Sequence, residues 1–287
     1  MITMKVSLIL ATLGRDNELI EFLNSLIHQT YCNFELIVID QNKNNKIDAI
    51  IESFRSFMDV KHIKVDFIGN AKARDYGIVF AKGGIIAFPD DDCVYECNVL
   101  EKVVDEFRNR HNISILAVGS YDFNSSNFSI GVNTIKPRYF SRLKMMGVEF
   151  THFFHLNRID KTQFYLDHDF GIGSKYSGAE GFELLYRLLR SNNKAFYNPY
   201  IKIYHANKDH YMLGTDRMMI YSEGIGAYIR KFTNQYDIYI LYYIFRKMFI
   251  APIIKILIAS MTLNAKKVSY SFFNLVGIWR GFLAYGR

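Results

Sequence analysis

The apolar positions of the first hundred residues fall in short continuous runs, separated by runs with helical spacing. Continuous apolar runs are typical of strands buried on both faces of a parallel sheet, whereas apolar residues three and four apart indicate an amphipathic helix. The pattern predicts four strands, at residues 6–11, 34–40, 63–67 and 85–88. It predicts helices between them, at 19–27, 47–57 and 74–81. Strands that alternate with helices predict an α/β fold built from right-handed βαβ units and a mostly parallel sheet.

Beyond residue 98 the pattern is less regular. It predicts a helix at 99–110, a strand at 115–118, a helix at 180–190 and a short strand at 201–204. The stretch from Ser120 to Arg138 contains a polar run and predicts a long loop. A loop of this length inside a compact domain is often a lid or an acceptor-binding element.

From about Ile238 the chain is apolar and aromatic, yet no uncharged stretch approaches the roughly 18 residues that span a bilayer. At helical spacing, Arg246, Lys247 and Lys255 rim one half of a helix whose other half is apolar. This pattern predicts a basic amphipathic helical tail, residues 230–287, that lies on an anionic membrane surface. The alternative is a helix packed on the domain or on a partner subunit of a homo-oligomer.

Composition agrees with a folded body and a distinct tail. The chain has 287 residues, half of them hydrophobic, and a net charge of +7. The tail alone carries +8, so residues 1–229 carry −1. A near-neutral body argues against nucleic acid as a partner. We divide this body into residues 1–118 and 119–229.

The chain has only three cysteines, Cys32, Cys93 and Cys97. A sparse, odd set without a secretory signal pattern predicts a reducing cytosol. Cys93 and Cys97 are four apart, but no second pair of ligands stands nearby, so we interpret them as ordinary thiols rather than a zinc site.

Three consecutive carboxylates, Asp90, Asp91 and Asp92, follow the strand predicted at 85–88 and Pro89. They fall at the carboxyl end of the strand, the edge where open α/β sheets bind ligands. Adjacent carboxylates repel one another, and oxygen ligands of this kind suit Mg²⁺ or Mn²⁺. The triplet therefore predicts a metal site, with a solvated acidic turn as the alternative.

Several ordered motifs resemble those of glycosyltransferase family 2, inverting enzymes with the GT-A fold, and in particular its bacterial surface-polysaccharide members. The resemblance covers about residues 5–230 and rests on the segments 6–12, 36–40, 69–78, 88–92, 169–173, 177–190 and 204–205. It implies a GT-A domain over residues 1–229, with a nucleotide-binding half at 1–118 and an acceptor half at 119–229.

The resemblance implies that Thr12, Asp40, Arg74, Asp75 and Asp91 contact the donor. Asp40 ends a strand and offers an acceptor to an imide N–H, such as N3 of uracil or thymine. Arg74 is expected either to pair with the diphosphate or to brace the acidic loop, and a purely structural ion pair is the alternative. Asp75 stands where the family usually has Asn.

The resemblance also implies a bound cation. The second carboxylate of the pair Asp90 and Asp92 reaches Mn²⁺ or Mg²⁺, while Asp90 also holds the sugar or ribose of the donor. His205, just past a strand, is expected to be a third metal ligand or a phosphate contact, with a structural histidine as the alternative.

An inverting transfer needs one base, which takes the proton of the acceptor hydroxyl. Many relatives carry adjacent Glu and Asp, but this chain has Glu180 followed by Gly181. Glu180 is therefore the nearest candidate, and Glu183, one helical turn later, is the second. The alternative is that Glu180 is a helix N-terminal charge favoured by the dipole.

Together, the resemblance implies metal-dependent transfer from a UDP- or dTDP-linked sugar to a lipid-linked, polyprenyl-type or growing surface glycan such as an O-antigen. The expected location is the cytoplasmic face of the bacterial inner membrane, as a peripheral protein. One alternative is a sugar nucleotidyltransferase, although residues 11–15 supply only one glycine and one arginine for its glycine-rich loop. The other is a catalytically degenerate membrane scaffold.

Overall fold

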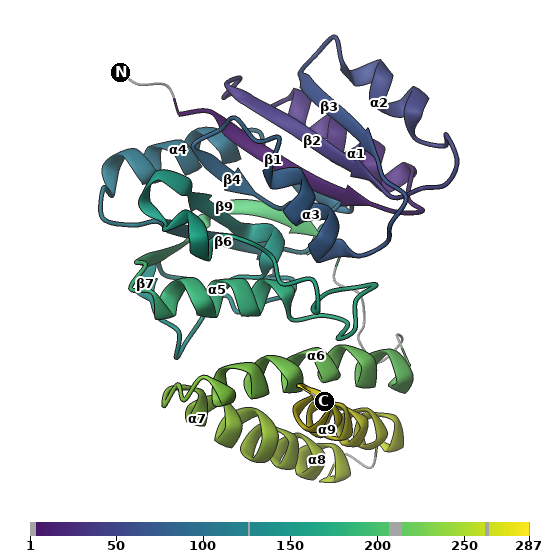
Figure 1. Ribbon diagram of the computed structural model, residues 1–287, viewed down its shortest axis with the longest axis vertical. Helices are drawn as coiled ribbons and strands as arrows, with labels where there is room; N and C mark the ends of the chain where they lie inside the picture. The colour runs from purple at the N-terminus through teal and green to yellow at the C-terminus, as the bar shows by residue number, and fades with distance from the viewer. Residues whose placement is uncertain (1–3, 126, 207–213, 262–263, 287) are drawn as a thin grey trace. The chain divides into compact units, whose positions relative to one another are not determined.

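The computed structural model describes residues 4–125, 127–206, 214–261 and 264–286 (Figure 1). The chain divides into two compact units. The first comprises Met1–Leu166 and Leu184–Asn207, and the second comprises Asp167–Glu183 and Lys208–Arg287. The boundary predicted after residue 229 lies inside a helix of the second unit.

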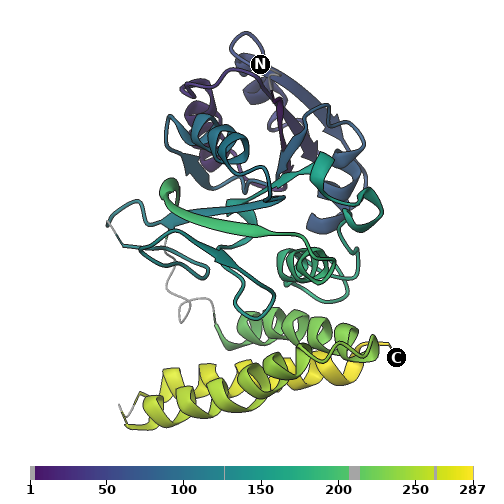
Figure 2. The same cartoon turned by 90° about the vertical axis from the view of Figure 1, so that its left-hand side faces the viewer.

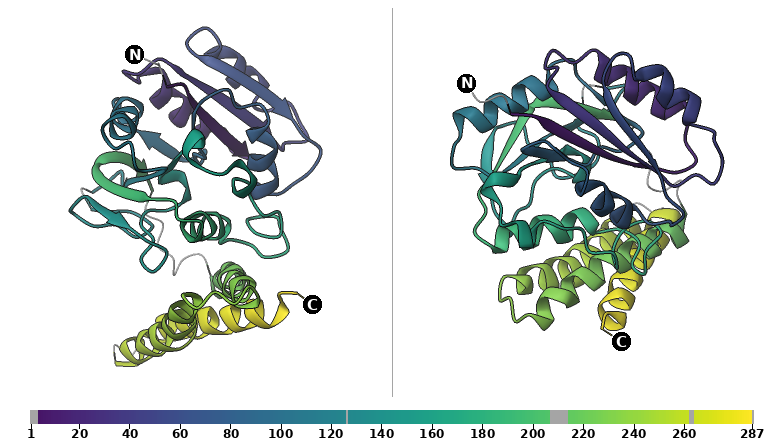
Figure 3. Two further views of the ribbon diagram at one scale, coloured as in Figure 1. Left: turned by 60° about the vertical axis from the view of Figure 1, so that its left-hand side comes forward. Right: turned by 45° about the horizontal axis from the view of Figure 1, so that its top comes forward.

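The first unit begins with the predicted βαβ units. Its parallel strands are β1 (Val6–Thr12), β2 (Phe34–Asp40), β3 (Asp59–Lys64) and β4 (Ile85–Ala87), in the order β3-β2-β1-β4. The connecting helices are α1 (Asn17–Ile27), α2 (Asp48–Phe54) and α3 (Asn70–Ile78) (Figure 3). In the register of β1 and β2, Thr12 lies opposite Asp40, so both strands end at the same edge of the sheet.

Both faces of this sheet are covered, which explains why its strands are continuously apolar. Leu8 points into a core that includes Phe22 of α1 and Val103 of the next helix, α4 (Val99–Asn109). Its neighbour Ile9 points to the opposite face, toward α3. Alternating side chains of one strand therefore hold helices on both sides.

Beyond β4 the sheet is mixed. The remaining strands are β5 (Cys93–Tyr95), β6 (Ile115–Tyr121), β7 (Arg138–Phe140), β8 (His152–His155) and β9 (Ala195–His205). The order continues β4-β8-β6-β9-β5, with β7 on β9, and β8 is antiparallel to both of its neighbours. The prediction of a mostly parallel sheet is therefore correct for the half from β3 to β4, whereas the other half is mixed and has one parallel pair, β6 with β9.

The loop predicted from Ser120 to Arg138 is shorter at both ends, because β6 runs to Tyr121 and β7 begins at Arg138. Within it, Tyr121 and Phe128 form an isolated antiparallel bridge. Residue 126 lies outside the described residues.

Helix α5 (Glu180–Arg190) starts in the second unit and has the predicted bounds. The unit continues with α6 (Thr215–Asn234), α7 (Ile240–Tyr243), a π-helical segment (Ile244–Ile250), α8 (Ala251–Met261) and α9 (Ala265–Ala284). Helices α6 and α9 lie side by side (Figure 2). A Cβ atom on Gly281 would collide with the Glu223 carbonyl oxygen, and one on Gly226 with that of Ile278. Glycine thus lets the two helices touch backbone to backbone.

The tail is helical as predicted, but the three basic residues expected along one side of its helix are not equally exposed. Arg246 and Lys255 are exposed, whereas Lys247 is partly covered, and burial beside Arg246 and Lys255 lowers the pKa of its ammonium group to about 8. The π-helical segment explains the difference, because its wider turns shift all later side chains relative to a regular α-helix. Within the described ranges, none of the helices combines the length and the apolar character that crossing a bilayer requires.

Candidate active site

The three carboxylates Asp90–Asp92, which we call the acidic loop, connect β4 to β5 at the carboxyl edge of the parallel strands. Strand β5 then pairs antiparallel with the end of β9, with Cys93 opposite His205. This pairing brings His205 beside the acidic loop, although the two are more than a hundred residues apart in sequence.

Asp90, Asp92 and His205 form a candidate metal site, since their ligand atoms all lie within 4.8 Å of one another. His205 Nε2 is 3.4 Å from Asp92 Oδ1, and the imidazole stacks on Phe150 with ring centroids 5.1 Å apart. Its Nδ1 is buried and has no hydrogen-bond partner among the described residues. Two carboxylates and one imidazole with an unused nitrogen fit Mn²⁺ or Mg²⁺, which the sequence predicted here.

Asp91 is not part of this trio and is held by other partners. Its Oδ2 accepts a hydrogen bond of 2.7 Å from the Thr12 hydroxyl, and its Oδ1 lies 2.5 Å from Arg15 Nη1. Burial raises the pKa of Asp91, and the opposing effects of Arg15 and Thr12 offset only part of that shift. Asp91 and Thr12 thus tie the acidic loop to the end of β1.

Arg74 pairs with the acidic loop, a contact that the predicted bracing role and the alternative of a purely structural ion pair share. Its buried guanidinium donates to Asp90 Oδ1 and to Glu149 Oε2, each at 2.5 Å, and to the Pro89 carbonyl at 3.3 Å. The neighbouring Asp75 accepts a hydrogen bond from the backbone N–H of Leu166, at 2.9 Å.

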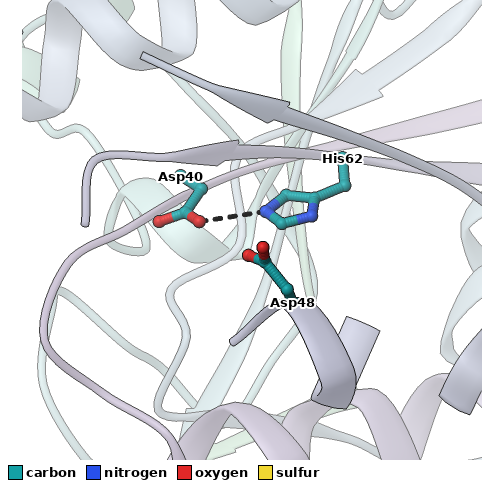
Figure 4. Close-up of side chains that lie close together, drawn as sticks. All are labelled: Asp40, Asp48 and His62. Atoms are coloured by element: carbon teal, nitrogen blue, oxygen red, sulfur yellow. Dashed lines mark hydrogen bonds and ion pairs between the residues drawn. The ribbon is translucent and has the colours of Figure 1, made fainter. Parts of the chain in front are cut away.

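Asp40 is fully buried at the end of β2, and each of its oxygens has a donor. Figure 4 shows the contact with His62. Oδ1 accepts from the backbone and side chain of Asn42, and Oδ2 lies 3.0 Å from His62 Nε2. Burial opposes ionisation, but these hydrogen bonds outweigh it and hold the pKa of Asp40 below its ordinary value. Asp48 lies near the pair and is bound by Lys64 at 2.8 Å.

The two candidate bases lie at the start of α5 and differ in their surroundings. Glu180 is 8% exposed and follows Gly178 and Ala179, which both have positive φ, at 95° and 67°. Such a conformation is strained for alanine, and strain of this kind clusters at functional sites. Glu183 is fully buried and accepts a hydrogen bond of 2.7 Å from Lys231 Nζ.

Lys231 of α6 also binds Asp167, at 2.6 Å. Burial lowers the pKa of Lys231, but the two carboxylates outweigh burial and raise it. The segment that contains Glu180 is therefore built into the second unit by a buried ion-pair network.

Sequence reasoning did not find Arg15, Glu149, His62 or Lys231 as partners of the predicted site residues. Arg15 follows strand β1 of the parallel sheet, so its position at the carboxyl edge was a usable signal, whereas His62 lies inside β3 and gave none. Glu149 and Lys231 reach their partners through tertiary packing that no local pattern reports.

Comparison with known proteins decides the family. The model of glycosyl transferase family 2 matches residues 7–163, more than half of the chain. The chain belongs to glycosyl transferase family 2. The family match includes the acidic loop and Arg74, whereas Glu180, Glu183 and His205 lie beyond it. Family membership also favours glycosyl transfer over the nucleotidyltransferase alternative.

Relatives within the family are similar over part of their length. The UDP-Glc:alpha-D-GlcNAc-diphosphoundecaprenol beta-1,3-glucosyltransferase WfgD of Escherichia coli is 29% identical over 146 residues, 50% of this chain and 56% of WfgD. An uncharacterized glycosyltransferase of Rickettsia bellii is 34% identical over 97 residues, 34% of this chain and 14% of the relative. The chain thus spans less than two thirds of either relative.

Solved structures of other proteins share the fold. TarS 1–349 of S. aureus matches with a TM-score of 0.63 and 16% identity, over 99% of this chain and 73% of TarS. The mannosyltransferase PcManGT of Pyrobaculum calidifontis, in complex with GDP-Man and Mn²⁺, matches with a TM-score of 0.70 and 10% identity. The match covers 97% of this chain and 87% of PcManGT. These likenesses confirm the expected GT-A architecture.

Proposed function

We propose that this protein transfers a sugar from a UDP- or dTDP-linked donor to a hydroxyl of a lipid-linked or growing surface glycan, with inversion at the anomeric carbon. The observation that best supports this proposal is that Asp90, Asp92 and His205 lie together at the carboxyl edge of the sheet in a family 2 chain. A UDP-linked donor is supported by the name of WfgD and by the complex of TarS with UDP-GlcNAc. The name of WfgD also supports a lipid-linked acceptor.

The chain's own residues supply donor binding. Asp90, Asp92 and His205 would hold Mn²⁺ or Mg²⁺, which when bound acts as a Lewis acid on the diphosphate leaving group. Arg74 fixes Asp90, and Thr12 anchors the loop through Asp91. Asp40, kept ionised, would accept the imide N–H of the pyrimidine base after exchanging one of its present donors, Asn42 or His62.

Glu180 is the proposed general base. Its carboxylate takes the proton from the acceptor hydroxyl as that oxygen attacks the anomeric carbon and the bond to the diphosphate breaks. Glu183 is the weaker candidate, because it is fully buried and its carboxylate neutralises Lys231.

We further propose that the protein is peripheral at the cytoplasmic face of the bacterial inner membrane. Along the π-helical segment and α8, large apolar side chains are 42–84% exposed and together form the apolar face, made of Phe249, Ile250, Ile253, Ile254, Leu257, Ile258 and Met261. Exposed Arg246 and Lys255 add positive charge, which suits an anionic bilayer.

A panel of nucleotide sugars tests the function. We expect one donor to raise the melting temperature only when Mn²⁺ or Mg²⁺ is present, and Asp92→Asn to abolish that rise. Asp105→Asn, at an exposed ion pair on α4, is the control and should behave as the native protein does. NMR of the product then reports the anomeric configuration. Donor binding that is independent of divalent cations, or a retained anomer, would contradict the proposal.

A further inference from the structure

Arg15 lies in the loop between β1 and α1 and binds two carboxylates of the acidic loop at once. Its Nη1 is 2.5 Å from Asp91 Oδ1 and 2.8 Å from Asp92 Oδ2. Asp92 is one of the three residues of the candidate metal site. One nitrogen of Arg15 therefore neutralises a carboxylate that a divalent cation would use, through Oδ2 of Asp92, while Oδ1 of the same residue faces His205.

The two arginines of the site differ in how firmly they are held. Arg74 has a side chain only 1% exposed and bridges two acids from different elements, Asp90 and Glu149. The Arg15 side chain is 34% exposed, and its ion pairs with described residues are all to the acidic loop. Arg15 is thus free to exchange its partner for solvent or a ligand, whereas Arg74 is fixed.

We propose that Arg15 is a displaceable counter-ion that exchanges Asp92 for the donor diphosphate. Without ligand, its guanidinium neutralises Asp91 and Asp92, which would otherwise repel each other. When cation and donor occupy the site, Arg15 releases Asp92 and contacts the diphosphate, since a guanidinium fork suits phosphate oxygens. Arg15 therefore disfavours the bare cation and favours the cation together with a diphosphate.

This inference rests on the proposed function and predicts two affinity changes of opposite sign. In Arg15→Met, which keeps the length and removes the charge, Mn²⁺ alone should bind about 3–10-fold more tightly, because its competitor is gone. Inorganic pyrophosphate at saturating Mn²⁺ should bind at least about 10-fold more weakly, because a charge-assisted contact is lost. Loss of free-Mn²⁺ EPR signal reports the first affinity and calorimetry the second.

Two further variants serve as comparisons. Arg15→Lys keeps the charge without the fork, so its Mn²⁺ affinity should stay near the native value while pyrophosphate binding is partly restored. Lys46→Met removes a positive charge from the neighbouring exposed pair with Asp16, 3.0 Å long, and should change neither affinity. Equal melting temperatures of the variants without ligand show that the fold is intact.

The outcomes separate the inference from the proposed function. If the native protein binds Mn²⁺ and Asp92→Asn does not, but Arg15→Met leaves either affinity unchanged or weakens both, the counter-ion role is wrong and the metal site stands. If the native protein binds no Mn²⁺ at all, both the metal-dependent function and the role of Arg15 are overturned.

Discussion

At the residue scale, the three carboxylates of the acidic loop have three different sets of neighbours. Asp90 is held by Arg74, Asp91 by Thr12 and Arg15, and Asp92 lies between Arg15 and His205. This division explains how three adjacent negative charges coexist in a partly buried loop. It also separates a bracing carboxylate, Asp91, from the two that face the candidate metal position.

Glu180→Gln tests the proposed base, because glutamine keeps the shape and the hydrogen-bonding capacity but cannot accept the proton. We expect turnover to fall by about 10²–10⁴-fold with donor affinity little changed. Steady-state transfer kinetics and donor titration measure the two effects. Glu183→Gln should instead lower the melting temperature, because Lys231 loses a buried partner.

The base assignment fails if Glu180→Gln retains near-normal transfer while Glu183→Gln folds but is inactive. A collapse of donor affinity in Glu180→Gln would indicate that Glu180 holds the sugar.

His152 makes stability depend on pH. Burial lowers its pKa from 6.5 to about 4, while its Nε2 lies 2.8 Å from the Met146 carbonyl oxygen. The unfolded chain therefore takes up the proton first, so stability is lost as pH falls from 6.5 toward 4. At pH 5 the loss from His152 is about 2 kcal/mol of the unfolding free energy. Urea unfolding measures the free energy of unfolding at pH 7.5 and at pH 5. The decrease between the two pH values should be about 2 kcal/mol smaller in His152→Gln than in the native protein. Equal decreases in the two proteins would refute this assignment.

At the scale of elements, the sequence predicts best where the apolar runs are long. Strand β2 and helix α5 have the predicted bounds. Strand β3 lies at 59–64 rather than 63–67, because an edge strand with charged residues has no continuous apolar run. Strand β9 begins six residues earlier than predicted. Asn198 and Pro199 are typical of a turn, but in the structure they lie inside the strand, where an irregularity in the register with β6 accommodates them. The three-residue strands β5 and β7 carry no periodicity.

Helices α6 and α9 depend on glycine at their contact. Gly281→Ala should destabilise the protein by about 1–3 kcal/mol, because the added Cβ forces the helix backbones apart. Leu283→Ala, at a position of the same helix that is 52% exposed, is the control and should change stability little. Thermal unfolding of both variants measures the difference, and an unchanged Gly281→Ala would mean that the helices are less closely packed.

At the scale of the whole molecule, the chain divides into two units, each made of segments that local patterns do not join. Motif order placed Asp40, Asp90 and Asp92 correctly at one sheet edge, because parallel strands end together. It did not reveal that residues 167–183 belong with residues 208–287. That grouping depends on buried contacts such as Lys231 with Asp167 and Glu183, which are far apart in sequence.

Membrane association is tested on the apolar face of α8. Ile253 and Leu257 are 50% and 58% exposed there, so Leu257→Glu combined with Ile253→Glu should disrupt no core but oppose insertion into lipid. We expect the native protein to sediment with anionic liposomes and the double variant to lose at least about 10-fold in partitioning, as two buried apolar side chains are replaced by charges. Tyr139→Glu, at a half-exposed position of β7, is the control. Equal sedimentation of native protein and double variant would exclude this face.

The ion pairs of Lys231 and the contacts of Tyr285 with Phe170 and Tyr176 also set an order of events during synthesis. On the ribosome, the segment that carries Glu180 emerges roughly a hundred residues before Tyr285, which at about 5–20 residues per second is a delay of roughly 5–20 s. All strands of the first unit emerge before Lys231 and Tyr285, the packing partners of the segment that carries Glu180. A nascent chain therefore completes its sheet edge before the segment of the proposed base gains the contacts that hold it, and those contacts come from the helices that also present the apolar face.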